Sequence, residues 1–203
     1  PEMCLTGYCL DEKLLMNLEF LEDNKATLIN ELAPASRDID VIVGFLDFNP
    51  GETGPDGKPV RFNAAALLQR GRLTRIVHKR LLPSYGYFDD KRYFRPGTDF
   101  TPVEINTGQG RVKAGILICE DLWDDSYEIK PSRLLVDQGA EYIFCINASP
   151  FVCSSHEARD GKRFVRDRLI RDHVRDCGVL VVWVNTVGIG DNGKNIITFD
   201  GLS

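Results

Sequence analysis

A single cysteine at the end of an apolar run is the residue best suited to chemistry in this sequence. Residues 115–123 read Gly-Ile-Leu-Ile-Cys-Glu-Asp-Leu-Trp. Strand ends that face loops are common places for catalytic groups. A cysteine is useful there because its thiolate is a strong nucleophile that needs only modest activation. Cysteine is also among the most buried residue types, so simple packing is the alternative for Cys119.

The sequence offers no convincing histidine partner for this cysteine. Serine-type and papain-like mechanisms need one, and the three histidines are His78, His156 and His173. A carboxylate or a lysine is then the alternative partner. Lys79 is a candidate because it closes a predicted strand and precedes an aromatic loop stiffened by Pro83. The plainer alternative is that Lys79 is solvated on the surface, as most lysines are.

Two motif matches in residues 188–195 lack the structural context that they need. The run Gly-Ile-Gly-Asp-Asn-Gly fits the dinucleotide-binding pattern, and with Lys194 and Asn195 it nearly fits a phosphate loop. Both motifs require a following helix, whose N-terminal amides hold the phosphate. A β-type run follows instead, so we expect a turn. Cys153 and His156 have no second pair at ligand spacing, so we expect no zinc site.

The composition is typical of a soluble globular protein. The 203 residues are 43% hydrophobic and 27% charged, with a net charge of -5. A mildly acidic chain argues against nucleic acid or an anionic membrane as the main partner. No apolar stretch approaches the about 20 residues of a membrane-spanning helix. The six cysteines include no Cys-x-x-Cys pair, which favours a reducing cytoplasm over a disulfide scaffold.

The elements that must position these residues are strands and helices in a mixed order, which predicts an α/β architecture. Residues 49–59 hold three glycines and three prolines and read as a loop. Pro34 is expected to end a predicted helix over residues 25–32, because the residue before a proline disfavours helical backbone. Hydrophobic spacing predicts helices over 11–21, 25–32, 132–138 and 157–176, and strands over 41–46, 64–68, 73–78, 103–106, 113–119, 142–146, 179–185 and 196–199.

Six ordered segments resemble motifs of the nitrilase superfamily of carbon-nitrogen hydrolases. Within it they are most similar to the glutamine-hydrolysing domain of glutamine-dependent NAD synthetase. Each motif alone has little specificity, but the ordered set is specific and covers nearly the whole chain. The segments are 1–8 (Pro-Glu-Met-Cys-Leu-Thr-Gly-Tyr), 79–94 (beginning Lys-x-x-Leu-Pro-x-Tyr), 118–123 (Ile-Cys-Glu-Asp-Leu-Trp), 147–151 (Asn-Ala-Ser-Pro-Phe), 161–162 (Gly-Lys) and 199–203 (Phe-Asp-Gly-Leu-Ser).

The resemblance implies a catalytic triad of Glu2, Lys79 and Cys119. Cys119 would attack the side-chain carboxamide of glutamine and form a thioester, while Glu2 takes the thiol proton and later passes it to departing ammonia. The Lys79 ammonium would favour the thiolate. With the backbone N–H of the residue after Cys119, it would also stabilise the tetrahedral oxyanion. These steps need no metal or organic cofactor.

The resemblance also implies a set of substrate contacts. Tyr85, Glu120, Trp123 and Ser149 stand where the family lines its glutamine pocket. Lys162 stands where the family carries a basic residue near the substrate carboxylate. Glutamine is a zwitterion, so a pocket with one anion and one cation suits it. Core packing of the two aromatic residues and solvation of Lys162 are the alternatives.

By the same resemblance the fold class is α/β, a nitrilase-like four-layer αββα sandwich formed by residues 1–203 as a single domain. The chain begins at Pro1 without an initiator methionine and ends at Ser203. The family's first strand and helix would precede Pro1 and its last strands would follow Ser203, so we expect a fragment that is incomplete at both ends. Asp90 stands where the family usually has Glu, and its shorter arm would support Lys79 or touch the substrate.

The implied function is to release ammonia from glutamine for an NAD synthetase domain or subunit, in a cytoplasmic homo-oligomer without nucleic-acid or membrane partners. ATP and an NAD precursor would bind only in a synthetase domain, whose Ser-Gly-Gly loop does not occur in this sequence. Two rivals stay open. One is a free-standing amidase that acts on another small amide, and the other is a catalytically silent binding subunit.

Overall fold

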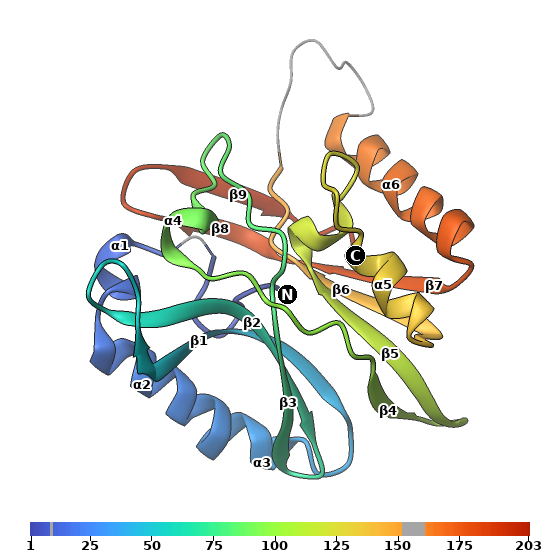
Figure 1. The fold of residues 1–203 in the computed structure, drawn as a ribbon, viewed down its shortest axis with the longest axis horizontal. Helices are drawn as coiled ribbons and strands as arrows, with labels where there is room; N and C mark the ends of the chain where they lie inside the picture. Colours follow the sequence, from blue (N-terminus) through green and yellow to red (C-terminus); the bar gives the residue numbers. More distant parts are fainter. Residues whose placement is uncertain (9, 152–160) are drawn as a thin grey trace.

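The described strands form two sheets and a separate hairpin (Figure 1). The computed structural model describes residues 1–8, 10–151 and 161–203, with the backbone alone for 161–164. The first sheet, β1-β2-β3, is antiparallel; in the second, β4-β5-β6-β7, the last three strands run parallel. The strands are β1 (Val41–Thr53), β2 (Pro59–Gln69), β3 (Arg72–His78), β4 (Val103–Thr107), β5 (Gly110–Ile118), β6 (Tyr142–Asn147), β7 (Leu180–Asn185), β8 (Val187–Asp191) and β9 (Ile196–Asp200).

The helix predicted over residues 11–21 is two helices, so the prediction of one continuous helix was wrong. Asn17 separates them because its side chain caps the second helix, where Oδ1 accepts from Phe20 N at 3.2 Å. The helical elements are α1 (Glu12–Leu15), α2 (Leu18–Thr27), the π turn η1 (Leu28–Leu32), α3 (Ala33–Ala35), α4 (Asp90–Tyr93), the 3₁₀ turn η2 (Cys119–Leu122), α5 (Pro131–Asp137) and α6 (Gly161–Cys177).

The helix predicted over 25–32 does not end before Pro34, which corrects a second boundary. Helical backbone continues from α2 through η1 into α3. Pro34 lies in the first turn of α3, where its missing N–H and fixed φ are tolerated. The predicted helix over 157–176 corresponds to α6, and its first four residues lie outside the described part of the chain.

Residues 49–59, predicted as a loop, lie mostly in strands. β1 runs on to Thr53 and β2 begins at Pro59, with a tight turn closed by Gly54 N donating to Lys58 O at 2.7 Å. The pairing register shifts between Asn49 and Thr53. Such a bulge interrupts the ladder of hydrogen bonds, and Pro50 can therefore lie within the strand.

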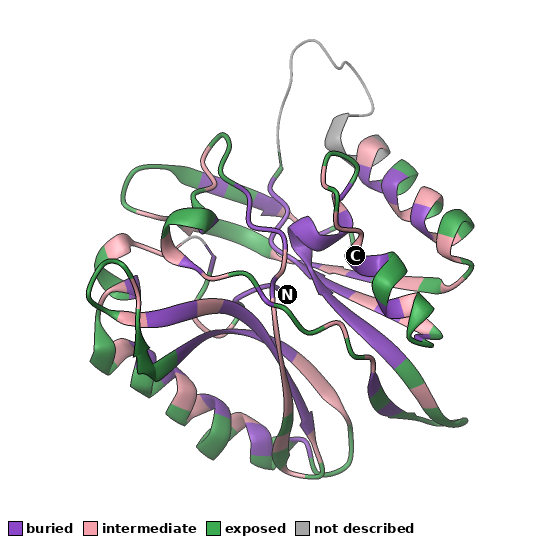
Figure 2. Ribbon diagram, in the orientation of Figure 1, coloured by how far each residue is buried: buried purple, intermediate pink, exposed green. Residues whose placement is uncertain are grey.

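Three of the hydrophobic clusters pack against the two sheets. Figure 2 shows which parts of the strands and helices are buried. One cluster lies between the helical segment α2–α3 and the first sheet, the second lies between the two sheets, and the third lies between the second sheet and helices α5 and α6. Representative pairs in these clusters are Leu28 with Phe45, Ala65 with Ile116, and Leu135 with Ile143.

The turn that the sequence predicted within residues 188–195 is present, and it joins β8 to β9 in a hairpin. Asn192 Oδ1 accepts from the backbone N of Lys194 at 3.1 Å and of Asn195 at 2.8 Å. Strand β9 follows the glycines where a phosphate loop would need a helix. Strand β8, which contains the first two glycines, was not predicted.

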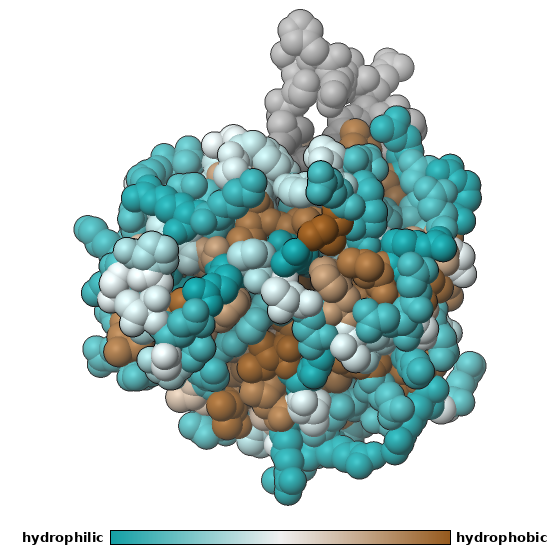
Figure 3. All heavy atoms as spheres, viewed as in Figure 1, coloured by the Kyte–Doolittle hydropathy of each residue, from teal (hydrophilic) through white to brown (hydrophobic). Residues whose placement is uncertain are grey.

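Exposed large apolar side chains occur on both helices and strands, for example Leu18 of α2 and Ile189 of β8. On the face drawn in Figure 3, hydrophobic residues gather toward the centre and hydrophilic residues cover most of the rim. In the part of the chain that the structure describes, no helix has both the length and the apolar character needed to cross a bilayer. The helices instead turn their apolar sides to the sheets.

The N-terminal segment crosses β1 at Gly44. Leu5 N donates to Gly44 O at 3.2 Å, and the buried Met3 belongs to a hydrophobic cluster with Leu46 and Phe94. A Cβ placed on Gly44 would overlap the backbone of Pro1 and Met3. Only glycine therefore lets the segment approach β1 this closely.

We expect Gly44→Ala to lower the free energy of unfolding by about 1–3 kcal/mol, because the added methyl group forces the N-terminal segment away from β1. Urea unfolding followed by circular dichroism measures the loss. Gly108→Ala is the matched control, since nothing lies within 4 Å of its added Cβ. Equal stabilities for the two variants would contradict this packing.

Candidate active site

Lys79 lies directly after β3, buried between two carboxylates. Its side chain is 1% exposed, and Nζ lies 2.6 Å from Glu2 Oε1 and 2.8 Å from Asp90 Oδ2. Burial alone would lower the pKa of the Lys79 ammonium, but the charges of Asp90 and Glu2 outweigh it and raise this pKa well above its usual range. Lys79 is therefore a fixed cation, and the alternative of a solvated surface lysine is wrong.

Asp90, the first residue of α4, is buried and directed at Lys79. Its second oxygen accepts from the Tyr8 hydroxyl at 2.9 Å. Burial raises the pKa of Asp90, the Lys79 ammonium lowers it, and the Glu2 charge raises it again. Of the two contacts that the sequence left open for Asp90, the structure provides the one to Lys79.

Glu2 is buried and held by three donors, although it lies in the N-terminal segment. Oε1 accepts from Lys79 Nζ and, at 2.7 Å, from Asn63 Nδ2. Oε2 accepts from the backbone N of Ala148 at 3.0 Å, and Glu2 N donates to Asn147 O at 3.3 Å. These contacts come from β2, from the residue after β3 and from the end of β6, and they satisfy a carboxylate that is costly to bury alone.

Cys119 follows β5 and begins η2 with a strained backbone. Its φ of 48° lies in the left-handed region that non-glycine residues rarely adopt. Asp121 braces this turn by accepting from the backbone N of Ile118 at 3.0 Å, of Arg80 at 2.9 Å and of Leu81 at 2.7 Å. Burial raises the pKa of Asp121 to about 7, although the three amides act to lower it. The turn that carries Cys119 is thereby tied to the segment that carries Lys79.

The Cys119 thiol interacts electrostatically with both Glu2 and Lys79. Burial raises its pKa well above the usual range, the Glu2 charge raises it further, and the Lys79 charge lowers it. The effect that the sequence led us to expect from Lys79 is present, but burial and Glu2 outweigh it. The cysteine at rest is therefore a neutral thiol.

Glu120, next to Cys119, accepts hydrogen bonds from two phenols. The Tyr85 hydroxyl lies 2.8 Å from Oε2 and the Tyr127 hydroxyl lies 2.9 Å from Oε1. Burial raises the pKa of Glu120, and both phenols lower it. Burial and the Glu120 charge raise the pKa of Tyr127 to about 12, so its hydroxyl stays a donor. Tyr85 is 55% exposed, which excludes a core role for its ring. The arrangement can accept a ligand cation.

Ser149, two residues after β6, is fixed by a buried arginine of α6. Arg166 donates from Nε to Ser149 Oγ at 3.2 Å and from Nη2 to Ser149 O at 2.7 Å. The same guanidinium pairs with Asp200 at 2.7 Å, and Asn185 Oδ1 accepts from Ser149 N at 2.8 Å. Because Oγ accepts from Arg166, the hydroxyl proton of Ser149 is directed elsewhere.

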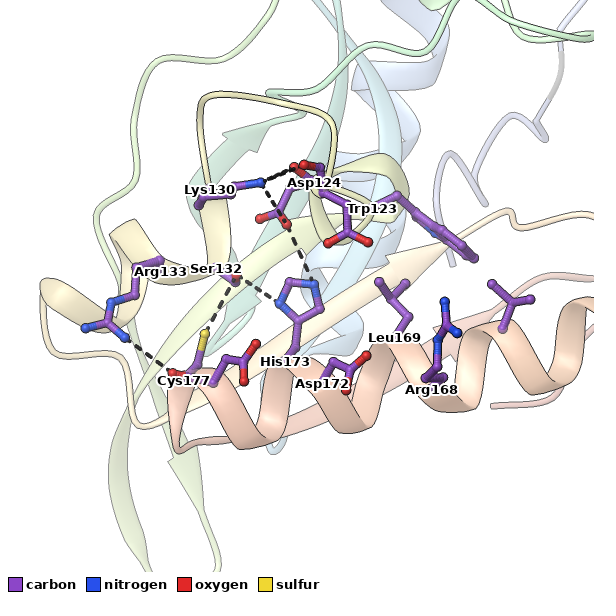
Figure 4. Close-up of a pocket in the computed structure, with 13 residues that line it drawn as sticks. Trp123, Asp124, Lys130, Ser132, Arg133, Arg168, Leu169, Asp172, His173 and Cys177 are labelled. Atoms are coloured by element: carbon purple, nitrogen blue, oxygen red, sulfur yellow. Dashed lines mark hydrogen bonds and ion pairs between the residues drawn. The ribbon is translucent and has the colours of Figure 1, made fainter.

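Trp123 lines a cavity of about 270 Å³ between the turn after η2, α5 and α6 (Figure 4). Its ring packs against the hydrophobic cluster that contains Leu122. In the same cavity, the His173 ring bonds Leu122 O through Nε2 at 2.6 Å and Ser132 Oγ through Nδ1 at 3.1 Å. Cys119 is not among the residues that line this cavity.

Lys162 lies at the start of α6, and its side chain is outside the described part of the chain. Cys153 and His156 also lie outside it. Across residues 1–8, 10–151 and 161–203, no group of three or more His, Cys, Asp and Glu side chains is arranged to hold a metal ion.

Sequence reasoning missed three residues of this site: Asn63, Tyr127 and Arg166. Asn63 carried a readable signal, because it is a polar residue at the head of an Ala-Ala-Ala-Leu-Leu run that is buried on both faces. Arg166 lies in a helix rich in arginine, where nothing in the sequence separates it from Arg168. Tyr127 lies in a polar loop without a motif.

The matches to known proteins agree with this geometry. A family model described as carbon-nitrogen hydrolase matches residues 1–168, which contain Glu2, Lys79 and Cys119. The chain belongs to the carbon-nitrogen hydrolase family. The chain has the fold of a carbon-nitrogen hydrolase from Helicobacter pylori G27, with a TM-score of 0.66 and 22% identity over 92% of this chain and 62% of that chain.

The chain is also homologous over its whole length to a part of glutamine-dependent NAD(+) synthetases. It is 34% identical over 203 residues to that of Xanthomonas campestris pv. campestris (strain 8004), covering 100% of this chain and 32% of the relative. The structure of the Acinetobacter baumannii enzyme in complex with ADP aligns with a TM-score of 0.76 and 28% identity, over 99% of this chain and 33% of that chain. The chain spans about a third of these relatives, and the resemblance read from its motifs is confirmed.

We expect Asp90→Asn to lower the free energy of unfolding by about 3 kcal/mol. The reason is that the Lys79 ammonium stays buried while one of its two carboxylates loses its charge. Urea unfolding at pH 7 gives the difference. Asp89→Asn is the control, since this neighbouring side chain is 53% exposed and its ion pair is long, at 3.8 Å. The ion-pair account fails when both variants unfold alike.

Proposed function

We propose that the chain hydrolyses the side-chain amide of glutamine to glutamate and ammonia through a thioester on Cys119. The observation that carries the proposal is the convergence of Glu2, Lys79 and Cys119. Glu2 and Lys79 touch at 2.6 Å, and the charges of both act on the buried thiol. Glutamine is favoured as the substrate because the full-length matches are named glutamine-dependent NAD(+) synthetases.

The reaction starts from a neutral thiol, so proton transfer accompanies attack. As Cys119 Sγ bonds to the carboxamide carbon, the S–H proton moves to the Glu2 carboxylate and the carbonyl π pair moves onto oxygen. The Lys79 ammonium and the backbone N–H of Glu120 stabilise this oxyanion. When the carbonyl re-forms, the C–N bond breaks, and the nitrogen takes the proton from Glu2 and leaves as ammonia. A glutamyl thioester remains on Cys119.

Water completes the cycle with the same groups. Glu2 accepts a proton as the water oxygen attacks the thioester carbon, and Lys79 again faces the oxyanion. The C–S bond then breaks, and the sulfur recovers its proton from Glu2. One water is consumed, and one glutamate and one ammonia are formed. This chemistry needs no cofactor; ATP and an NAD precursor belong to a synthetase reaction.

The zwitterionic end of glutamine is assigned to the polar residues around the thiol. Glu120 receives the α-ammonium group beside the Tyr85 ring, and Ser149 donates its hydroxyl proton to a substrate oxygen. Lys162 receives the α-carboxylate. Trp123 supports the pocket through the turn that it packs against. A negative charge from Glu120 and a positive charge from Lys162 around the zwitterionic end would select an amino acid over a simple amide.

The wider proposal concerns the role of the released ammonia. We assign the chain a four-layer αββα sandwich in a single domain, a cytoplasmic location and a homo-oligomeric state. Its ammonia would pass to an NAD synthetase domain or subunit. The support for a synthetase partner is that this chain matches about a third of relatives that are named glutamine-dependent NAD(+) synthetases.

We expect Cys119→Ala to lower ammonia release from glutamine by more than about 10³-fold, because the nucleophile is lost. A coupled glutamate dehydrogenase assay measures release, and mass spectrometry locates labelling by a glutamine-like diazo-ketone. Cys4→Ser, at an exposed thiol, should keep wild-type activity. Turnover of aliphatic amides but not glutamine would favour a free-standing amidase. The absence of both turnover and labelling would favour a catalytically silent subunit.

We expect Tyr127→Phe to raise the KM for glutamine about 10-fold with little change in kcat. The phenol stabilises the ionised form of Glu120, so its loss raises the pKa of Glu120 further and weakens ammonium binding. The rise in KM should grow as the pH is lowered toward 5, because Glu120 protonates earlier in the variant. Steady-state kinetics between pH 5 and 8 test this, with Tyr142→Phe on β6 as the control. A pH-independent KM would refute it.

A further inference from the structure

One buried asparagine contacts both members of the Glu2–Lys79 pair. Asn63 lies on β2 opposite Leu46 of β1 and is 1% exposed. Its Nδ2 donates to Glu2 Oε1 at 2.7 Å, and its backbone O accepts from Lys79 N at 2.8 Å. Any displacement of Asn63 would therefore move both residues.

The two oxygens of Glu2 are not equivalent in this environment. Among the residues that the structure describes, Oε1 accepts from Lys79 Nζ at 2.6 Å and from Asn63 Nδ2, while Oε2 accepts from Ala148 N alone, at 3.0 Å. A carboxylate oxygen offers two lone pairs. Both acceptor positions of Oε1 are filled, and Oε2 keeps one.

We infer that Asn63 is a positioning residue that makes Oε2 of Glu2 the atom that receives the Cys119 proton. The inference rests on the proposed function. By filling the second lone pair of Oε1, the Asn63 amide leaves a single acceptor on the carboxylate. Its hydrogen bond to the Glu2 carboxylate also fixes the orientation of that group.

The other half of the Asn63 amide supports a role directed at Glu2. Oδ1 is buried without a hydrogen-bond partner. The reversed amide would set Oδ1 against a carboxylate oxygen, so the observed orientation is the one that Glu2 imposes. A residue kept only to join the strands would need no side-chain amide here.

Several ionisable groups act on Glu2 or on its partners, and a pH measurement must take all of them into account. Lys79 and Asp90 lie within one ion-pair chain with it, and the Cys119 thiol responds to its charge. Cys145 of β6 also responds to the Glu2 charge. The Tyr8 ring lies 5.6 Å from Lys79 Nζ, and its hydroxyl bonds Asp90. A substitution at Asn63 leaves all of these ionisable side chains present.

The test replaces Asn63 by a side chain of similar size without the amide. In the full-length protein we expect Asn63→Leu to lower kcat/KM for glutamine about 10- to 100-fold and to move the acid limb of its pH profile upward by about one unit, since a hydrogen bond to a charged acceptor is lost. Asn24→Leu is the matched control. Asn24 is also buried, donates only to Leu46 O, at 2.6 Å, and likewise has an unpartnered Oδ1.

Asn63→Asp keeps the shape of the side chain and guards against a folding failure of Asn63→Leu. Its added negative charge should move the acid limb upward as well. The inference is overturned when the folded Asn63 variants keep the wild-type pH limb, or when Asn24→Leu shifts it equally. Either result would reduce Asn63 to a structural role.

A second readout separates this inference from the proposed function. The rate at which iodoacetamide alkylates Cys119, followed by peptide mass spectrometry, needs no amide substrate. The same upward shift of the acid limb in Asn63→Leu supports the inference even if the wild type releases no ammonia from glutamine, a result that would overturn the proposed function alone. An unshifted limb in an active wild-type background overturns the inference alone.

Discussion

A buried ammonium holds this site together. Lys79 is 1% exposed, and a cation can be buried at that depth only with opposite charge in contact. Glu2 supplies that charge from the N-terminal segment and Asp90 supplies it from α4. Neither carboxylate could be buried without the lysine, and the lysine could not be buried without them. Three segments far apart in the sequence therefore become ordered together, and the N-terminal segment is fixed to the core.

Burial and the charge of Glu2 raise the pKa of the Cys119 thiol, and the opposing effect of the Lys79 charge is smaller. Together these effects keep the thiol protonated. A neutral thiol is a weak nucleophile and a poor target for oxidation, so the site rests in an inert form. In the proposed reaction, activation depends on the transfer of the thiol proton to Glu2. The strained backbone of Cys119 lies at the end of β5, where the turn η2 begins.

The contacts that hold the site link neighbouring strand ends to one another. Asp121 joins the turn after β5 to the segment after β3, and Arg166 joins α6 to the residues after β6. Such ties are side chain to backbone, so they constrain the chain whatever the neighbouring side chains are. Because the two sheets pack face to face, the ends of β3, β5 and β6 can supply side chains to one small volume.

The sequence by itself was sufficient to nominate Cys119, Lys79 and Glu2 and to indicate an α/β fold, because motif order and hydrophobic period are properties of the chain itself. The strand predicted to end at Cys119 is β5, which ends one residue earlier, at Ile118. Only the tertiary structure decided that Asn63 bonds Glu2 and that Tyr127 bonds Glu120, because no local pattern relates the two residues of either pair. It also decided the protonation of the thiol, since a pKa depends on burial and on charges that folding brings near.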